Sequence, residues 1–235
     1  MSIAELRREY SLAGLRRKDL EADPIVQFKI WFEQATGARA SGRLRKLLVN
    51  TYKSLLLIKR EEVVDLNAMT LATADKEGRP SVRVVLLKGI DERGFIFYTN
   101  YNSHKGLDLA DNPRAALGFY WAHLERQVCI EGQVSQVSAT ESDAYFQSRP
   151  RGSRIAAWAS NQSSVIRDRA ELEEKWARVE REYAGKEVPR PPYWGGYVLN
   201  PLRFEFWQGR PNRLHDRFRY SRGSSGSWAI ERISP

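Results

Sequence analysis

The stretch from residue 68 to residue 100 constrains the fold most, because short apolar runs alternate there with turn sequences. The runs are AMTLATA, SVRVVLLKGI and FIFYTN, and the turns between them are DKEGRP and DERG. Runs of this kind are typical of β-strands, and such short connections join antiparallel neighbours. The sequence therefore predicts an antiparallel meander that begins at Ala68.

Further strands and helices are predicted along the rest of the chain. RAALGFYW and RQVCIEGQVSQVSA resume strand character, and YVLNPLRFEFWQG, RLHDRFRYSR and SWAIERIS predict the closing strands. Helices are predicted after Ser103, after a capping box of Thr140 and Asp143, and along an apolar stripe from Leu172 to Tyr183. Short sequential strands with helices inserted between them indicate an α+β fold built on an antiparallel β-barrel with peripheral helices.

Two helical segments are predicted before the strands. Asp23 and Pro24 form a helix start, and apolar residues then recur at helical spacing up to Gly37. The following segment is predicted to be a basic amphipathic helix, which could pack on its own domain or contact a membrane or a partner helix. The predicted division is an N-terminal helical arm over 1–36, a basic insert over 37–65 and a barrel domain over 66–235.

Composition limits the function classes. Of the 235 residues 42% are hydrophobic, which is enough for a substantial core, and the formal net charge is +9. That charge suits a partner that carries phosphate, whether nucleic acid, membrane or cofactor, but it also serves solubility. The single cysteine excludes a disulfide framework and a thiolate cluster. Without a signal-peptide run or a span of about 20 apolar residues, a cytoplasmic protein without membrane contacts is expected.

Several familiar motifs are missing from the sequence. There is no Walker A loop, no GxGxxG that opens a helix, no HExxH and no CxxC. The three histidines lie far apart in the sequence, so no metal site is expected. Any nucleotide must therefore be bound by residues outside these motifs.

Two places bring a cation into a predicted strand or to a predicted helix start. Arg83 interrupts an apolar strand, which indicates either a fixed anionic partner or an exposed edge. In YTNYNSHKG a strand ends and a helix begins, so free backbone donors, the hydroxyl of Ser103 and the charge of Lys105 suit a phosphate.

Two later stretches also concentrate polar and cationic groups. YFQSRPRGSR spaces a tyrosine, an arginine and a serine four residues apart near a helix end, which suits phosphate oxygens or a solvated loop. In WQGRPNRLHDR an extended backbone would project Arg213, His215 and Arg217 to one face. Because burying unpaired cations is costly, that face meets water or an anion.

The separated blocks of this sequence resemble one enzyme family. They are RREYSLAGLRRKDLEADP, NAMTLAT, VRVVLLKG, FYTN, LERQV, YFQSRPRGS, QSSVI, WGGY and EFWQGRPNRLHDR. In this order they resemble the pyridoxine (pyridoxamine) 5'-phosphate oxidase family over 1–36 and 66–235. The resemblance implies an FMN-binding split barrel and a homodimer with FMN at the subunit interface. It also implies an oxidase of pyridoxal phosphate biosynthesis.

The resemblance also implies roles for particular residues. The implied flavin contacts are Arg83, Val84, Val85, Leu86, Leu87, Tyr98, Thr99, Ser103, His104, Lys105, Gln127, Gln162, Ser163, Trp207 and Arg217. The implied substrate contacts are Arg7, Tyr10, Lys88, Tyr145, Arg149, Ser153, Arg213 and His215, of which Arg213 and His215 are the implied catalytic pair. The implied reaction passes a hydride from pyridoxamine or pyridoxine 5'-phosphate to the flavin, and oxygen becomes hydrogen peroxide.

The sequence departs from the family pattern at a few positions. His104 stands where the family has arginine, so weaker flavin binding is expected, and Arg154 and Ala156 replace glutamine and glycine. Two other functions stay open at this point. One is a flavin reductase or another split-barrel flavoprotein, and the other is a basic barrel that binds nucleic acid.

Overall fold

The computed structural model describes residues 9–12, 14–37, 65–223 and 226–235. The predicted basic helix and Arg7 lie outside these residues. The described residues fall into two compact units, one within 1–68, 118–129 and 203–235 and the other within 69–117 and 130–202. They are called here the first and the second unit.

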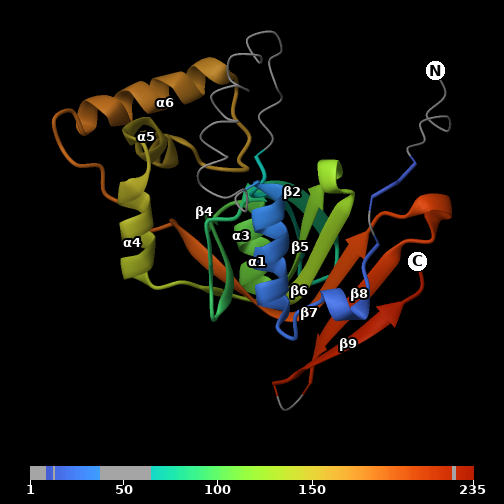
Figure 1. Cartoon of the computed structure of the whole chain (residues 1–235). Helices are drawn as coiled ribbons and strands as arrows, with labels where there is room; N and C mark the ends of the chain where they lie inside the picture. The colour runs from blue at the N-terminus through green and yellow to red at the C-terminus, as the bar shows by residue number, and fades with distance from the viewer. Residues whose placement is uncertain (1–8, 13, 38–64, 224–225) are drawn as a thin grey trace, which may run out of the picture. The chain divides into compact units, whose positions relative to one another are not determined.

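An antiparallel sheet carries the second unit. Its strands are β1 (Ala68–Ala74), β2 (Pro80–Leu86), β3 (Gly89–Asp91), β4 (Gly94–Asn100), β5 (Arg114–Trp121), β6 (Arg126–Gln136) and β7 (Trp194–Gln208). Along the sheet the order is β2-β1-β5-β6-β7-β4-β3. Figure 1 labels β2, β4, β5, β6 and β7 of this sheet. Strands β5, β6 and β7 contribute residues to both units.

The strands predicted between Ala68 and Asn100 are confirmed, but the uninterrupted meander is wrong. Strand β4 pairs with β3 and β7, and β2 lies at the other end of the strand order. Burial gives the physical reason. Nearly every residue of β4 is buried, so this strand needs neighbours on both sides, whereas β2 alternates between exposed and half-buried residues as an edge strand does.

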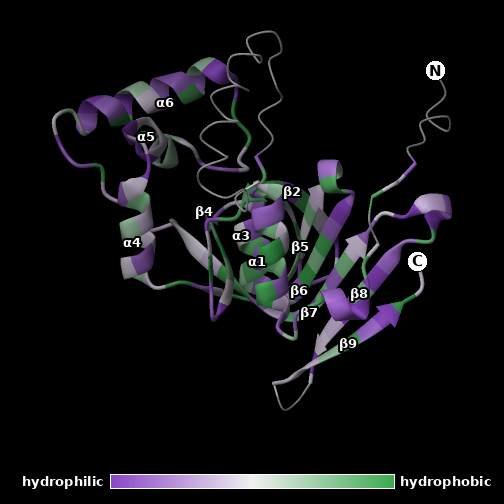
Figure 2. Ribbon diagram, viewed as in Figure 1, coloured by the Kyte–Doolittle hydropathy of each residue, from purple (hydrophilic) through white to green (hydrophobic). Residues whose placement is uncertain are grey.

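The helices of the second unit are α3 (His104–Asp111), α4 (Ala139–Ser148), α5 (Arg151–Ala159) and α6 (Arg169–Glu182). Ser103 caps α3 as predicted, since its hydroxyl accepts the Gly106 N–H. The predicted cap of α4 is wrong, because Ser138 and Glu141 form the capping box two residues earlier. Figure 2 shows α6 as largely hydrophilic, which agrees with its burying only Val179 against the core.

The first unit places one helix against aromatic side chains of strands. Helix α1 (Pro24–Ala35) begins at the predicted cap Asp23. It buries Phe28 against Phe119, at 4.9 Å between ring centroids, and Trp31 against Phe206, at 5.2 Å. The closing strands β8 (Asp216–Arg222) and β9 (Trp228–Ile233) pair with each other, and β8 pairs with β7, all antiparallel. The predicted C-terminal hairpin is therefore confirmed.

The strand predicted from Arg213 starts later than expected. A single 3-10 turn covers Pro211–Arg213, and β8 begins at Asp216. Asn212 and Arg213 have φ of 56° and 60°, which is left-handed backbone and not extended chain. The alternation that was expected to align Arg213 with His215 and Arg217 therefore does not reach Arg213. Within the described ranges, no helix combines the length and the apolar character that crossing a membrane requires.

Candidate active site

A cavity of about 870 Å³ in the second unit brings most of the predicted site residues together, a volume in the range of small-molecule sites. Of the predicted flavin contacts it is lined by Arg83, Val84, Val85, Leu86, Tyr98, Thr99, His104, Lys105, Gln162 and Ser163. Of the predicted substrate contacts it is lined by Lys88, Tyr145, Arg149 and Ser153. Strands and helices that are far apart in the sequence thus bring the predicted flavin contacts and the predicted substrate contacts to the same cavity.

Other predicted residues do not line this cavity. Leu87 and Ser103 are buried next to lining residues in the sequence. Gln127, Trp207, Arg217, Tyr10, Arg213 and His215 belong to the first unit. Sequence reasoning missed Ser81, Asn100 and Trp194, which line the cavity. Ser81 and Asn100 lay in predicted strands, and Asn100 and Trp194 lay in the blocks FYTN and WGGY, but nothing in the sequence marked these three as lining residues.

Lys105 is a buried cation at the start of α3. Its Nζ donates to Thr99 Oγ1 at 3.2 Å, to Ser103 Oγ at 3.1 Å and to Gln162 Oε1 at 3.1 Å. Burial, with the nearby charge of Arg83, lowers the pKa of Lys105 to about 8. No carboxylate is among these three partners, so the cation would gain from an anion in the cavity.

A glycine allows α3 to begin so close to the preceding strand. A Cβ on Gly106 would lie 2.1 Å from the carbonyl oxygen of Tyr101, which no side chain could tolerate. The close approach brings the N-terminal turn of α3, with Ser103 and Lys105, to the cavity end of β4. This arrangement fits the phosphate site predicted from the sequence, because the start of a helix and a cation lie at the same cavity.

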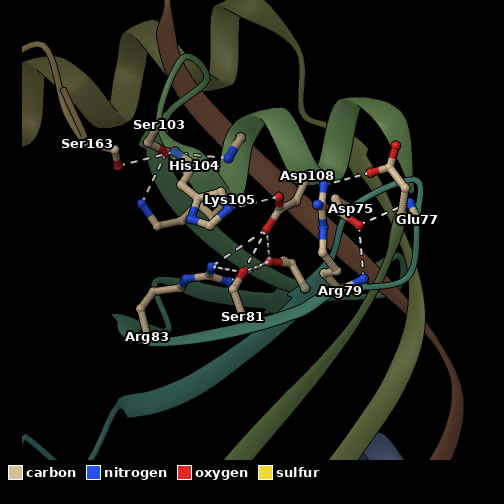
Figure 3. A network of polar contacts seen from close by, with 12 residues as sticks. Asp75, Glu77, Arg79, Ser81, Arg83, Ser103, His104, Lys105, Asp108 and Ser163 are labelled. Carbon is tan, nitrogen blue, oxygen red and sulfur yellow. Dashed lines mark hydrogen bonds and ion pairs between the residues drawn. The ribbon is translucent and has the colours of Figure 1, made fainter.

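Arg83 is held by a polar network on its own and the neighbouring strand. Its Nη1 donates to Thr73 Oγ1 and its Nη2 to Ser81 Oγ, each at 2.6 Å. The Asp108 carboxylate lies 3.7 Å from Nη2 (Figure 3). Burial lowers the pKa of Arg83, and the charge of Asp108 partly offsets this. The expected fixed partners of Arg83 are therefore present, and sequence reasoning missed Asp108.

His104 joins this network from the exposed side. Its backbone N–H donates to Ser163 Oγ at 3.2 Å, and its Nε2 lies 3.5 Å from Asp108 Oδ1. The side chain is 66% exposed and lines the cavity. That flavin binding is weaker because histidine stands at position 104 in place of arginine stays a prediction.

Aromatic rings support the predicted substrate contacts. Tyr145 stacks on Tyr98 with ring centroids 3.8 Å apart, and the Tyr145 and Trp194 rings are nearly parallel at 6.2 Å. The Arg149 guanidinium lies over Trp194, 4.5 Å from its ring centroid. This packing contradicts the alternative of a freely solvated loop at Arg149.

Arg149 also carries an unsatisfied donor. Its Nη1 is buried and has no hydrogen-bond partner within the described part of the chain. Burial lowers the pKa of Arg149, which the nearby Tyr145 partly counteracts. Buried donors without partners are rare in folded proteins, and here the donor belongs to a cavity-lining cation. An anionic ligand would satisfy it.

The exchanges at 154 and 156 lie on α5. Arg154 donates from Nη1 to Gln147 Oε1, and its Nε is buried without a partner among the described residues. Ala156 lines the cavity. Nothing in the structure explains why these two residues differ from the family pattern.

In the first unit, Tyr10, Trp207 and His215 form an aromatic cluster. The ring centroid of His215 lies 4.6 Å from that of Trp207 and 5.5 Å from that of Tyr10. The Arg210 N–H donates to His215 Nδ1 at 3.1 Å, so a neutral ring carries its proton on Nε2. Burial, with the charges of Arg213 and Arg217, lowers the pKa of His215 and favours that neutral ring at pH 7.

Carboxylates hold the segment that contains Tyr10. Glu125, which is 3% exposed, accepts the backbone N–H groups of Ser11 and Leu12 at 3.0 and 3.1 Å. The Asp216 carboxylate accepts the backbone N–H of Leu15 at 3.0 Å. The predicted substrate contact Tyr10 therefore lies in a segment that is tied to its own unit.

Arg217 and Gln127 have protein partners in the first unit. Arg217 stands opposite Trp207 in the ladder of β7 and β8 and forms two hydrogen bonds to Glu205, at 2.7 and 2.9 Å. Gln127 Nε2 donates to Cys129 Sγ at 3.3 Å. Arg213 is exposed. Flavin or substrate contact by these residues stays a prediction.

Comparison with known proteins identifies relatives over the whole chain. Residues 59–182 match the family described as pyridoxamine 5'-phosphate oxidase, and 194–235 match the C-terminal dimerisation region of pyridoxine 5'-phosphate oxidase. Pyridoxine/pyridoxamine 5'-phosphate oxidase of Bordetella petrii is 53% identical over 235 residues and covers 100% of both chains. That of Ralstonia pickettii is 52% identical over 234 residues, 100% of this chain and 99% of the relative.

Solved structures give the same fold. PhzG from Burkholderia lata 383, in complex with tetrahydrophenazine-1-carboxylic acid, aligns with a TM-score of 0.80 at 30% identity and covers 97% of this chain and 100% of its own. A pyridoxamine 5'-phosphate oxidase-related, FMN-binding protein from Nostoc punctiforme aligns with a TM-score of 0.59 at 18% identity, with coverage of 84% and 98%. The predicted antiparallel split β-barrel is thereby confirmed, and the chain belongs to the pyridoxamine 5'-phosphate oxidase family.

Proposed function

We propose that the protein is an FMN-dependent oxidase that converts pyridoxamine or pyridoxine 5'-phosphate into pyridoxal 5'-phosphate and reduces oxygen to hydrogen peroxide. The observation that carries this proposal is a single cavity with two sets of cations on different elements. Arg83 and Lys105 come from β2 and α3, and Arg149 follows α4 with an unsatisfied buried donor. Two phosphorylated molecules would satisfy both sets.

The residues fit FMN as the first of these ligands. Lys105 and Arg83 would hold its phosphate together with the N-terminal turn of α3, which Ser103 caps. The buried Lys105 cation matches the charge that a phosphate brings. FMN, when bound, supplies the acceptor for a hydride and the reaction with oxygen.

The second cation set would hold the substrate phosphate. Arg149 offers a preformed fork of donors over Trp194, and Lys88, Tyr145 and Ser153 line the same cavity. Anchoring the phosphate would fix the position of the pyridine ring and so lower the entropic part of the barrier. Of the first unit, Arg213 and His215 stay the proposed ring contacts, with His215 able to donate from Nε2.

We also propose that the protein acts as a homodimer with FMN at the subunit interface. The match of 194–235 to the family's C-terminal dimerisation region supports the dimer. Strand β2 supports it independently, because its side chains Val82 and Val84 are each 68% exposed and line the cavity. Apolar side chains at a sheet edge gain from a partner surface.

Oxidation of a substrate without phosphate is the second candidate. The likeness to PhzG with its bound tetrahydrophenazine-1-carboxylic acid favours it. An absorbance spectrum of the purified protein tests both candidates. We expect a flavin spectrum that bleaches when pyridoxamine 5'-phosphate is added without oxygen, and oxygen uptake when air is admitted. Unphosphorylated pyridoxamine is the matched control and should be far less effective.

The outcomes separate the candidates. A flavin that pyridoxamine and its phosphate bleach equally well would favour the second candidate. A colourless protein that stays inactive after addition of FMN would exclude both. If that colourless protein also bound nucleic acid with steep salt dependence, it would be the basic nucleic-acid-binding barrel that the sequence left open.

A further inference from the structure

Asp108 is a buried carboxylate next to the cavity, and nothing in the proposed reaction uses it. Its side chain is 4% exposed, and it does not line the cavity. It lies on α3 and accepts two hydrogen bonds on Oδ2, from Thr73 Oγ1 at 2.6 Å and from Ser81 Oγ at 2.8 Å (Figure 3). Burial alone would raise the pKa of Asp108, but these bonds and the charges of His104 and Arg83 lower it.

The directions of these hydrogen bonds fix the partners of Arg83. A hydroxyl has one proton to donate and two lone pairs that accept. Thr73 Oγ1 and Ser81 Oγ also lie 3.1 Å from each other, but the carboxylate is the stronger acceptor for both protons. When both hydroxyls donate to Asp108, only lone pairs remain to face Arg83. The guanidinium donates to both oxygens at 2.6 Å. The carboxylate thus helps to determine, through two hydroxyls, where the guanidinium lies, together with the Leu71 carbonyl that accepts from Nη1 at 3.3 Å.

We infer that Asp108 is a positioning residue for a ligand phosphate, acting on Arg83 through the hydroxyls of Thr73 and Ser81. The inference deepens the proposed function and rests on it, because the phosphate in question is that of FMN. Asp108 touches Arg83 at 3.7 Å but not the cavity, so its effect on the ligand passes through the network. A preformed guanidinium loses less freedom when the phosphate binds.

Simple electrostatics gives the opposite expectation, which makes the inference testable. A carboxylate close to a phosphate repels it, so removing the charge should tighten FMN binding if charge were all that Asp108 contributed. A positioning role depends on the acceptor and not on the charge. Replacement by asparagine keeps an oxygen that can accept both hydroxyl protons, whereas replacement by alanine removes it.

The experiment compares FMN with riboflavin, which lacks the phosphate, in fluorescence titrations of apoprotein variants. We expect Asp108→Ala to weaken FMN binding by about 10-fold or more while riboflavin binding changes less than about 2-fold. Asp108→Asn should stay close to the unchanged protein for both flavins. If the Ala and Asn variants tighten FMN equally, or if Ala weakens both flavins equally, the positioning role is wrong.

A second pair of variants leaves the buried Asp108 side chain in place. Thr73 lies on β1 outside the cavity lining, and valine there keeps the shape of the side chain without its hydroxyl. Thr73→Val should lower the preference for FMN over riboflavin, and Thr73→Ser, which keeps the hydroxyl, should restore it. Equal preference in both variants would overturn the inference.

Failure of the proposed function would look different. It would appear in the unchanged protein, as no binding of FMN or no preference for it over riboflavin. Failure of the inference alone would leave that preference intact in the unchanged protein, and no variant would lower it. Thermal unfolding of each apoprotein verifies that the variants fold.

Discussion

The rings of Tyr98 and Tyr145 stack with their centroids 3.8 Å apart and their planes 16° apart. The pair joins β4 to α4, and through Trp194 the row of rings reaches the guanidinium of Arg149. A residue predicted to contact the flavin is thus packed against one predicted to contact the substrate phosphate. The stack is worth about 0.5 to 1.5 kcal/mol beyond the burial of its area. It gives the predicted flavin and substrate positions a common wall.

Replacing Arg149 should affect substrate binding and not the flavin. Arg149→Ala removes the cation with the unsatisfied buried donor, so we expect KM for pyridoxamine 5'-phosphate to rise by about 10-fold or more. Steady-state oxygen uptake measures KM, and a flavin titration should be unchanged. Arg151→Ala is the matched control, because Arg151 donates to the backbone carbonyl groups of Tyr183 and Lys186 and does not line the cavity. Equal KM in the two variants would refute the role of Arg149.

Lys105 should make flavin binding depend on pH. Because its pKa is lowered to about 8 without a ligand, the lysine loses its proton as the pH rises through that value. A phosphate prefers the protonated form, so the affinity for FMN should fall above pH 8, by up to about 10-fold per pH unit. Fluorescence titration from pH 7 to 9.5 measures this.

Two variants of lysine separate this effect from general alkaline effects. Lys105→Met should bind FMN more weakly at pH 7 and should show a flatter profile above pH 8. Lys175→Met is the control, since Lys175 pairs with Glu171 on α6 and does not line the cavity. A profile in Lys105→Met as steep as in the unchanged protein would assign the pH dependence to another group.

An arginine at position 104 should strengthen flavin binding. Arg carries a permanent charge and a fork of donors, whereas His104 offers a shorter ring that faces Asp108 at 3.5 Å. We expect His104→Arg to tighten FMN by a few-fold, on the order of 1 kcal/mol, with little effect on riboflavin. Titration of both flavins measures the difference. Unchanged or weaker FMN binding would show that the exchange at this position does not limit affinity.

Arg213 should matter for turnover and not for the flavin or the fold. Its side chain is exposed and its backbone has φ of 60°, so truncation to alanine removes no packing. We expect Arg213→Ala to lower kcat by about 100-fold, the scale for loss of a group that stabilises developing charge, while FMN stays bound. Rapid mixing with substrate in the absence of oxygen measures flavin reduction directly. Loss of the flavin from this variant would reassign the residue.

Local signals in the sequence predicted the family and most helices, but they missed α5, which begins directly after Pro150. Asp23 and Ser103 cap their helices as expected, because a cap depends on side chains within three residues. The predicted cap of α4 at Thr140 was wrong, since Ser138 has an equally good hydroxyl two residues earlier. The sequence blocks around Arg83, Tyr145 and Arg213 were sufficient to indicate the family, which the comparisons then confirmed.

Local sequence patterns were sufficient to place most strands and helices and to show which side chains carry charge, since these depend on neighbours along the chain. Tertiary structure alone decided what those charges meet. Asp108 reaches Thr73 and Ser81 only because α3 packs against β1 and β2, and no local pattern encodes that contact. Arg213 left the expected strand because two left-handed residues turn the chain before β8 begins. Hydrogen bonds between distant segments form only after the sheet has set their register, so their partners become visible in the folded chain alone.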